Sequence, residues 1–435
     1  MDCYCRSRSR RLCKELQRMT DFQPRSLGDV VELKRGYDLP ARLRSDGPYA
    51  LVSSSGPSDR HAKAKVRGPG VVTGRYGTIG QVFFVEGDFW PLNTTLYVRD
   101  FKGNDPRFIY YFLQTLDWHK FNDKSGVPGV NRNDAHREPV LIPNPVDQRA
   151  IAKMLGSLDD KIELNRQMNE TLEAMAQSIF RDWFVDFGPT RRKLEGAVDP
   201  ITIMGGLVQD IERAQALADL FPAALGDDGP PEGWSFGIAS SLIEFNPKEP
   251  LKKGTPAPYS DMSSLPTSGS LADLPVERGY GSGMRFRNGD ALLARITPCL
   301  ENGKSAFVDF LPDAQTVGWG STEFYVLRSR KGVPAPFAYL LVRHPDFRAA
   351  AIASMTGTSG RQRAQVDRLK DFPFAGAPME LLGEFGKFIL PMFDKITANG
   401  GESRTLAATR DLLLPKLMSG EICLSEAESV MEAAQ

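Results

Sequence analysis

Two short segments of the sequence share a pattern of side chains that can bind nucleic acid. SGVPGVNR (125–132) and TGTSGRQR (356–363) both have the form [ST]-G-x-x-G-x-x-R. Arg and Lys pair with guanine, Asn and Gln pair with adenine, and hydroxyl groups bind phosphate oxygens. Glycine lets the backbone approach a ligand closely. The pattern indicates contact with DNA, although the same glycines also suit turns and the same arginines a solvated rim.

Further polar residues lie beside glycines elsewhere in both halves of the chain, in TGRYGT, NTT, ARIT, NGKS and ST. Together with the two segments they form the predicted DNA-binding set. In the first half this set is Arg75, Tyr76, Thr78, Asn93, Thr94, Thr95, Ser125, Gly126, Asn131, Arg132 and Asn133. In the second half it is Arg295, Thr297, Lys304, Ser321, Thr322, Thr356, Gly357, Arg361, Gln362 and Arg363.

Known catalytic signatures are not matched. ENGKS (301–305) resembles the end of a phosphate-binding loop, but that motif requires Gly at position 298, which is Pro. GYGSG (279–283) lacks a strand-to-helix context and is interpreted as a loop. The sequence contains neither H-E-x-x-H nor an Asn-Pro-Pro-aromatic box, and its four histidines are scattered. We therefore expect no active site and no cofactor.

The cysteines do not indicate a metal site. Cys3, Cys5 and Cys13 crowd the start of the chain, whereas Cys299 and Cys423 lie far from them and from each other. An odd total with no nearby His argues against both a zinc site and a disulfide framework. We expect the basic leader (1–18) to be disordered or to reflect the choice of start codon, since Met19 is also a natural start.

Length and composition indicate a soluble protein of several domains. The chain has 435 residues, of which 41% are hydrophobic and 25% charged. No run of about 18 apolar residues occurs, so no membrane span is expected. The leader has no apolar segment of the kind that follows the charges of a secretory signal. A cytoplasmic location is predicted.

Charge alternates along the chain although the net charge is zero. Segments 21–145 and 229–378 each hold 17 Lys/Arg against 14 Asp/Glu, a balance of +3. Segments 146–228 and 379–435 hold 9 against 15 and 5 against 9, giving −6 and −4. Mildly basic and acidic blocks suit two different kinds of partner surface.

The same alternation follows an internal repeat. Asp-Lys-Ile, an Asn three residues later and a Thr-Leu pair recur at an offset of 234 between 158–175 and 392–409. Elsewhere Arg75 aligns with Arg295, and Gly80 with Gly303. Further aligned pairs are NTTLYV (93–98) with STEFYV (321–326), RFIYYFL (107–113) with PFAYLLV (336–342), and the two opening segments with each other. Because only the offset drifts and the order is kept, the chain has the form A-B-A-B.

The A and B segments differ in type. In the A segments, runs such as QVFFVEG and EFYVLR indicate strands, and FIYYFLQTL indicates a helix, so a mixed α/β (α+β) fold is predicted. The B segments carry apolar residues in 3-4 spacing, the seam of a coiled coil. Such a helix cannot bury its stripe alone, and two copies in one chain supply each other's partner. Two unrelated amphipathic helices are the alternative, but they would not explain the Asn shared by both copies.

We assign helix pairing to Leu155, Leu158, Ile162, Asn165, Leu172, Ile179, Ile396, Asn399, Leu406, Leu413 and Leu417. Asn165 and Asn399 are expected to be at least half buried, because an Asn on a seam fixes register. Gly400 and Gly401 weaken the second helix by roughly 1 kcal/mol each relative to Ala. The second helix is accordingly expected to start late or bend there.

These residues resemble the specificity subunit of type I restriction-modification systems. The resemblance is carried by LGSLDDKIELNRQMNETLEAMAQSIFRDWFVDFGP (155–189), RYGTIGQV with FWPLNTTLYV, TGTSGRQR and LFPAALGDDGPPEGW. It extends from Met19 to about Leu424. It implies that each A segment is a target recognition domain for one half of a split site in double-stranded DNA. It also implies that each B segment is a helix of an antiparallel coiled coil that sets spacing and docks two methyltransferase subunits. Restriction subunits join that complex, and the specificity subunit has no catalysis of its own.

The predicted domains follow from the repeat. They are a leader (1–18), target recognition domain 1 (19–145), a central spacer helix (146–187), a linker (188–228), target recognition domain 2 (229–378), a C-terminal spacer helix (379–424) and a tail (425–435). A solitary DNA methyltransferase or nuclease, and a scaffold that binds no DNA, are the competing functions. The enzyme would bind S-adenosylmethionine or metal by itself, and the scaffold would not retard duplexes.

Overall fold

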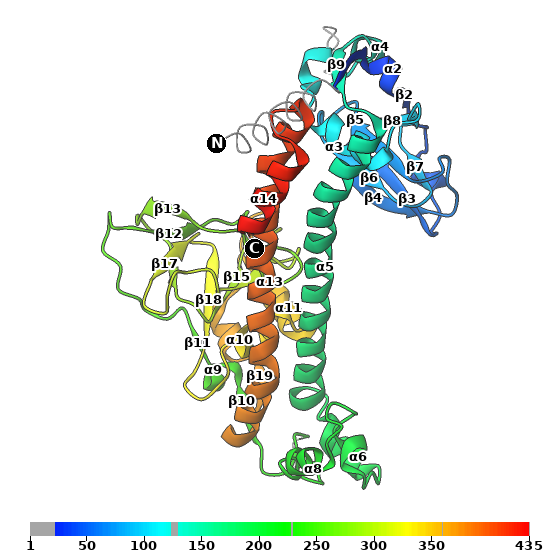
Figure 1. Cartoon of the computed structure of the whole chain (residues 1–435). Helices are drawn as coiled ribbons and strands as arrows, with labels where there is room; N and C mark the ends of the chain where they lie inside the picture. The colour runs from blue at the N-terminus through cyan, green and yellow to red at the C-terminus, as the bar shows by residue number, and fades with distance from the viewer. Residues whose placement is uncertain (1–21, 123–128, 228, 359, 435) are drawn as a thin grey trace, which may run out of the picture. The chain divides into compact units, whose positions relative to one another are not determined.

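The computed structural model describes residues 22–122, 129–227, 229–358 and 360–434. The chain divides into two compact units, of which unit 1 comprises residues up to Glu163 and from Ser403 onward, and unit 2 comprises Leu164–Glu402. Both contain helices and sheets, so the predicted mixed α/β class is confirmed (Figure 1). In the described residues, no helix is long and apolar enough to cross a membrane.

The described residues of unit 1 form three small sheets. Its strands are β1 (Gln23–Ser26), β2 (Glu32–Arg35), β3 (Tyr49–Ser53), β4 (Gly56–His61), β5 (Gly70–Gly74), β6 (Val82–Val85), β7 (Phe89–Pro91), β8 (Thr95–Asp100) and β9 (Pro139–Ile142). Its short helices are α2 (Leu27–Val30), α3 (Pro106–Gln114) and α4 (Arg132–His136), with 3-10 turns at Ala41–Leu43 and Trp118–Phe121. The sheets have the orders β2-β8-β5-β6, β4-β3-β7 and β1-β9.

Unit 2 repeats this arrangement. Its strands are β10 (Ser235–Ile238), β11 (Ile243–Phe245), β12 (Pro256–Ser260), β13 (Val276–Gly279), β14 (Met284–Phe286), β15 (Asp290–Ala294), β16 (Ser305–Phe307), β17 (Gly318–Gly320), β18 (Phe324–Ser329) and β19 (Pro373–Gly376). Its shorter helices include α9 (Ala239–Leu242), α10 (Pro336–Arg343), α11 (Pro345–Ala353) and α12 (Val366–Lys370). The sheets β11-β18-β15-β16, β13-β12-β17-β14 and β10-β19 match those of unit 1 in strand order, with β14 as an addition.

Strand pairing corrects one alignment made on sequence. Gly74 pairs with Thr95 in unit 1, and Ala294 pairs with Phe324 in unit 2. Thr95 is therefore equivalent to Phe324, and both are fully buried. The sequence alignment placed Thr95 opposite Glu323, one residue away. Since successive side chains of a strand point to opposite faces, a slip of one residue exchanges inward and outward positions.

The two long helices are α5 (Pro145–Phe184) and α13 (Met379–Ser419). They run side by side in Figure 1, and each contributes to both units. Their contacts are antiparallel within unit 2, where Asn165 Nδ2 donates to Glu402 (2.8 Å). Further along α5 the partners lie earlier in α13. Asn169 Oδ1 accepts from Asn399 Nδ2 (2.8 Å), and Asn169 Nδ2 donates to the Ile396 carbonyl (3.3 Å). The predicted antiparallel helix pair is confirmed.

The predicted seam is also buried. Asn165 and Asn399 are 0% and 1% exposed, so the expectation that they are at least half buried is confirmed. The other residues assigned to helix pairing are buried, except Ile162, Leu172 and Leu406, which are partly buried. The prediction of a late start for the second helix is wrong, because α13 begins at Met379 and is helical through Gly400 and Gly401. Packing of the buried seam outweighs the weak helix propensity of two glycines.

Two segments have more structure than the sequence suggested. The segment 188–228, predicted as a linker, holds α6 (Gly188–Leu194), α7 (Pro200–Ile203) and α8 (Ile211–Asp219), and Ala214 and Leu217 of α8 are buried. The predicted tail 425–435 lies mostly in α14 (Leu424–Ala434), whose Ala427 is fully buried in unit 1. Short helices with small apolar faces give little periodic signal, which explains why both were missed.

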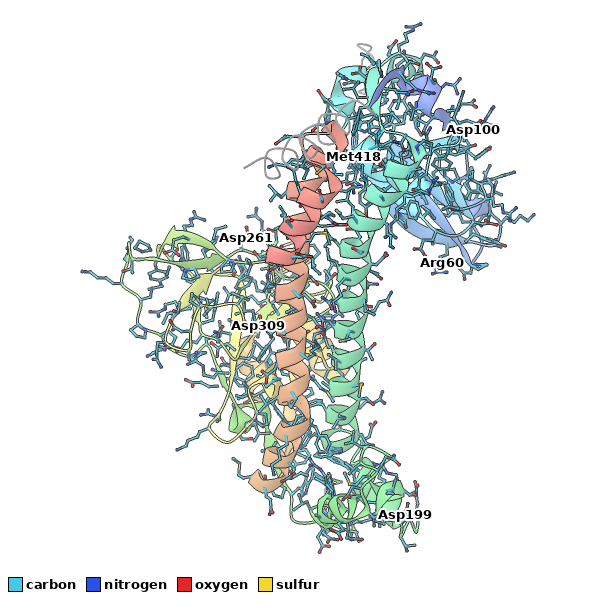
Figure 2. All side chains as sticks on the ribbon, in the orientation of Figure 1. Arg60, Asp100, Asp199, Asp261, Asp309 and Met418 are labelled. Carbon is cyan, nitrogen blue, oxygen red and sulfur yellow. The ribbon has the colours of Figure 1, made fainter. Side chains whose placement is uncertain are left out.

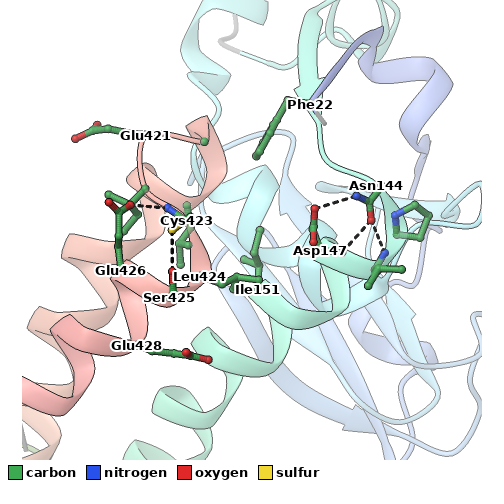
Figure 3. Close-up of a pocket in the computed structure, with 15 residues that line it drawn as sticks. Phe22, Asn144, Asp147, Ile151, Glu421, Cys423, Leu424, Ser425, Glu426 and Glu428 are labelled. Atoms are coloured by element: carbon green, nitrogen blue, oxygen red, sulfur yellow. Dashed lines mark hydrogen bonds between the residues drawn. The ribbon is translucent and has the colours of Figure 1, made fainter. Parts of the chain in front are cut away.

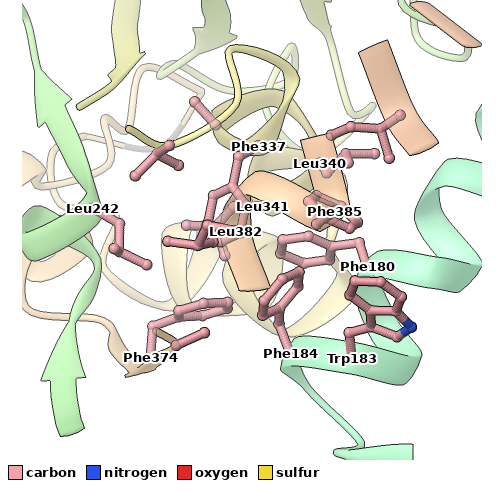
Figure 4. Packing of buried hydrophobic residues seen from close by; sticks show 14 of the residues in the cluster. Phe180, Trp183, Phe184, Leu242, Phe337, Leu340, Leu341, Phe374, Leu382 and Phe385 are labelled. Atoms are coloured by element: carbon pink, nitrogen blue, oxygen red, sulfur yellow. The ribbon is translucent and has the colours of Figure 1, made fainter. Parts of the chain in front are cut away.

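The core of unit 2 is built around aromatic side chains of α5. Phe180, Trp183 and Phe184 pack against Phe337 of α10 and Phe385 of α13 (Figure 4). The ring centroids of Phe184 and Phe385 are 4.8 Å apart, in an edge-to-face arrangement. Helix α13 thus belongs to the same core as the sheet and α10.

Polar contacts also fix the long helices to the other elements of their unit. In unit 2, Tyr339 donates to the buried Glu173 carboxylate (2.8 Å). Thr397 donates to Asp309 (2.6 Å), a residue that is labelled in Figure 2. In unit 1, Asp159 accepts a hydrogen bond from Tyr111 (2.5 Å) and forms an ion pair with Arg410 (2.6 Å).

We predict that replacing both Asn165 and Asn399 by Leu raises the melting temperature, because two buried amides give way to apolar side chains. The gain should be on the order of 1 kcal/mol in unfolding free energy. The same change should loosen helix register, measured as faster hydrogen exchange along α5 and α13. Ser178→Leu, at an exposed position of α5, is the control and should change neither quantity. A lower melting temperature in the double variant would mean that the amide contacts stabilise the helix pair on balance.

Candidate nucleic-acid interface

In unit 1, main-chain hydrogen bonds hold three of the predicted DNA-binding segments together. The N–H groups of Arg75 and Tyr76 donate to the Thr94 carbonyl (2.8 and 3.1 Å), and the Val130 N–H donates to the Arg75 carbonyl (3.0 Å). The Arg75 guanidinium lies 4.4 Å from the centre of the Tyr76 ring. These bonds bring the loop after β5, the turn before β8 and the segment before α4 to one place.

Unit 2 has the same backbone framework. The Arg295 N–H donates to the Glu323 carbonyl (3.0 Å), and the Ala364 N–H donates to the Arg295 carbonyl (2.8 Å). In addition, the Gln362 N–H donates to Thr297 Oγ1 (3.1 Å). The predicted alignment of Arg75 with Arg295 agrees with these matching bonds.

Glu323 joins two arginines of the unit 2 site. Its carboxylate accepts from Arg295 Nε (3.1 Å) and from Arg363 through Nη2 (2.6 Å). The Arg363 guanidinium, followed by that of Arg295, holds the pKa of Glu323 below its ordinary value. The carboxylate is therefore ionised at neutral pH and fixes both guanidinium groups in position, while the Arg363 side chain stays 45% exposed.

The structure overturns the pairing of Arg132 with Arg363. Gly129 bridges to Tyr76 in unit 1, whereas Arg363 bridges to Ile296 in unit 2. Gly129 is thus the counterpart of Arg363, and Arg132, three residues further on, opens α4. The two loops differ in length before this point, so the shared pattern aligned them in the wrong register.

Several predicted residues have structural roles. Thr95 is fully buried, and its hydroxyl donates to the Leu92 carbonyl (2.8 Å), which excludes it from contact with DNA. Asn131 caps α4 by accepting from the Asn133 N–H (3.0 Å). The Lys304 ammonium donates to the Met262 carbonyl (2.7 Å), so this cation is tied to a loop. Ser321 Oγ accepts from the Glu323 N–H (3.1 Å).

The remaining predicted residues stay candidates. Arg132, Asn133, Thr322, Gly357 and Arg361 are exposed. Thr78 is partly buried, and Asn93 donates to the carboxylate of Asp38. Thr356 shares two backbone bonds with Arg363 (3.0 and 2.9 Å) and belongs to the unit 2 group. Ser125 and Gly126 lie outside the described residues.

Glu323 and Asp38 were missed by the sequence analysis, which considered only donors and hydroxyls. A carboxylate accepts a hydrogen bond from the cytosine amino group, so acidic residues also belong in a search for base contacts. In the sequence, Glu323 directly follows the predicted residues Ser321 and Thr322, whereas no signal marks Asp38.

An open cleft of about 850 Å³ lies in unit 1 (Figure 3). Phe22, Ile151 and Leu424 line it together with the acidic residues Asp147, Glu421, Glu426 and Glu428. Four carboxylates disfavour a phosphate, so this cleft does not extend the candidate DNA-binding surface. Among the described residues, no group of three or more His, Cys, Asp or Glu side chains could hold a metal ion.

Known proteins resemble this chain along most of its length. Residues 19–174 match the family of the type I restriction modification DNA specificity domain. The chain is 23% identical to the type I restriction enzyme HindI specificity subunit of Haemophilus influenzae, over 93% of this chain and 100% of that protein. It is 25% identical to the MjaIX specificity subunit of Methanocaldococcus jannaschii, over 77% of this chain and 74% of that protein.

The predicted resemblance to type I specificity subunits is confirmed. The fold is also shared with the crystal structure of the type I restriction-modification S subunit from M. genitalium, at a TM-score of 0.54 and 15% identity. That likeness covers 91% of this chain and 96% of the other. The matched specificity domain contains the Arg75 loop, α4 and the first thirty residues of α5.

We predict that Asn131→Ala lowers unfolding free energy by about 1 kcal/mol, because α4 loses the side chain that caps its N-terminus. Asn131→Asp keeps an oxygen acceptor and should retain most of the stability. Chemical denaturation of both variants measures the difference. Equal stability of the Ala variant and the unaltered chain would show that the cap contributes nothing and would return Asn131 to the candidate DNA contacts.

Proposed function

We propose that this specificity subunit recognises a bipartite target in double-stranded DNA, with each recognition domain binding one half. The proposal rests on the two arginine loops, which are held by the same backbone bonds in both units but carry different side chains. Contacts between such side chains and base edges carry sequence information, whereas the shared frame only positions them.

The proposal includes the domain boundaries predicted above and assigns the long helices to spacing and to docking. Their segments carry the acidic balances of −6 and −4, while the recognition segments carry +3 each. Basic surfaces suit DNA, and acidic surfaces suit protein partners. Two methyltransferase subunits would dock on the helices, and restriction subunits would join through that complex. The subunit itself would be non-catalytic and would bind no cofactor.

Arg363→Ala should weaken binding to one half of the target and Arg132→Ala to the other. The expected loss is about 1–3 kcal/mol where the contact is a bidentate pair with a base. Methylation mapping in a host that carries this subunit and its methyltransferase first identifies the target. Retardation of duplexes altered in one half at a time then measures each effect.

Arg368→Ala and Arg137→Ala are matched controls, since both positions are exposed and lie within five residues of the tested arginines. An equal loss on every duplex, with a smaller salt slope, would indicate a phosphate contact. Unchanged affinity on all duplexes would refute a DNA-binding role for the altered arginine.

The long helices should act as a ruler between the two half-sites. Four residues inserted after Glu163 in α5, with four more after Glu402 in α13, lengthen both helices by ~6 Å. This is close to two base pairs at the ~3.4 Å rise of duplex DNA. Methylation mapping should find both half-sequences unchanged and one or two more unspecified base pairs between them.

Two-residue insertions at the same places serve as the comparison, because they rotate the apolar face by roughly 200° and should break helix pairing. An unchanged gap in an active four-residue variant would mean that another element sets the distance. A changed half-sequence would mean that the helices take part in base recognition.

A further inference from the structure

In unit 1, one tryptophan is surrounded by tyrosine and lysine. Trp90 lies on β7, which pairs in parallel with β3. Lys65 Nζ lies 5.1 Å from the centre of the Trp90 ring and 6.0 Å from that of Tyr37, and Lys34 Nζ lies 5.5 Å from the Tyr37 ring. We name Tyr37, Trp90, Lys34 and Lys65 the unit 1 cation–aromatic cluster.

Unit 2 has a corresponding arrangement on β17. Arg278 lies 4.8 Å from the centre of the Tyr259 ring and 5.9 Å from that of Trp319, whose Nε1 donates to the Arg278 carbonyl (3.2 Å). Arg285 lies 5.8 Å from the centre of the Tyr280 ring. These five residues form the unit 2 cation–aromatic cluster.

The two tryptophans occupy equivalent positions. Each is the central residue of a three-residue strand that pairs in parallel, Trp90 with Leu51 and Trp319 with Tyr259. The tyrosines, in contrast, come from different places in the two units. Tyr37 follows β2, whereas Tyr259 lies in β12 and Tyr280 directly follows β13. The two units therefore build the same kind of cluster from different residues, which a requirement for apolar packing alone does not explain.

The cations of both clusters lack acidic partners. In the part of the chain that the structure describes, none of Lys34, Lys65, Arg278 and Arg285 forms an ion pair with a carboxylate, whereas Arg295 and Arg363 share Glu323. Lys65 and Arg278 are exposed. A cation held against an aromatic face keeps its remaining N–H groups free, and it loses little side-chain entropy when it binds an anion.

We propose that the two cation–aromatic clusters bind phosphates of the DNA backbone beside the half-sites. The proposal rests on the proposed function and assigns a different DNA contact to each of two sites within a unit. The arginine loops contact base edges, and the clusters hold the backbone without regard to sequence, as contacts to phosphate do. Lys and Arg without carboxylate partners suit this second role, because each phosphate they neutralise releases a counterion.

The test uses the full chain in complex with its methyltransferase subunits and duplexes with and without the mapped target. The variants are Lys34→Gln with Lys65→Gln, and Arg278→Gln with Arg285→Gln. Each double variant should lower affinity equally for both duplexes and should reduce the slope of log K against log salt by up to about two. The methylated sequence should stay the same. Arg278→Lys with Arg285→Lys, which keeps the charge, should restore the slope.

Lys102→Gln and Lys331→Gln are the matched controls. Both lysines are exposed and lie in the turn after the equivalent strands β8 and β18. Lys102 lines a cleft with Asn144 and Pro145 at the start of α5, and none of the four cluster residues lines that cleft. These variants should leave the slope unchanged.

Three results would overturn the inference. A salt slope equal to that of the controls would exclude phosphate contacts, and an altered target sequence would assign the clusters to base recognition. Loss of the methyltransferase subunits with an unaltered slope would assign them to a protein partner. If the unaltered complex retarded no duplex at all, the proposed function itself would fail, and this outcome is distinguishable because it does not depend on any variant.

Discussion

Every part of this fold depends on the antiparallel pairing of α5 with α13, two helices that are distant in sequence. Neither helix has a local partner for its apolar stripe, so each unit is completed by residues from both. In unit 1, Leu413 and Leu417 of α13 enter the same core as Leu155 of α5 and Phe112 of α3. In unit 2, Phe385 of α13 packs against Phe184 of α5 and Phe337 of α10. The internal repeat is thus a physical requirement, because a single A-B segment would leave its helix half uncovered.

Apolar packing alone would leave the helix register weakly fixed, and the buried polar residues resolve this. The amides of Asn165 and Asn399 reach partners on the opposite helix, and a shift by one turn would bury them without those partners. Glu173 extends the same restraint to α10, because its carboxylate accepts a hydrogen bond from Tyr339. Burial raises the pKa of Glu173, whereas the hydrogen bond from Tyr339 lowers it. The position of α5 relative to α10 is therefore fixed within unit 2.

Periodicity over many turns made the two long helices predictable. The strands and loops have no such periodicity, so their alignment between the two units was less accurate. The 3-4 spacing of the seam located Asn165 and Asn399 correctly, since an error of one residue would have disagreed with several neighbours. The strand β8 offered only six residues, and the tyrosines Tyr97 and Tyr325 suggested an alignment that the pairing of Gly74 and Ala294 contradicts. The loop with Arg363 was aligned by pattern alone, which cannot account for an insertion. Glu323 was overlooked because its role depends on two arginines that only the folded chain brings together.

The backbone frame explains how one chain can hold two sites of different chemistry. Arg75 and Arg295 make matching main-chain bonds, yet the residues that meet them differ, with Thr94 in the place of Glu323 and Gly129 in the place of Arg363. Bonds between main-chain groups do not depend on the side chain, so these positions tolerate replacement without loss of the frame. A carboxylate only accepts hydrogen bonds whereas a threonine hydroxyl both donates and accepts, and an arginine offers donors that a glycine side chain lacks. Under the proposed function, the two units therefore present different hydrogen-bonding patterns to DNA, and an asymmetric target is the expected consequence of a symmetric fold.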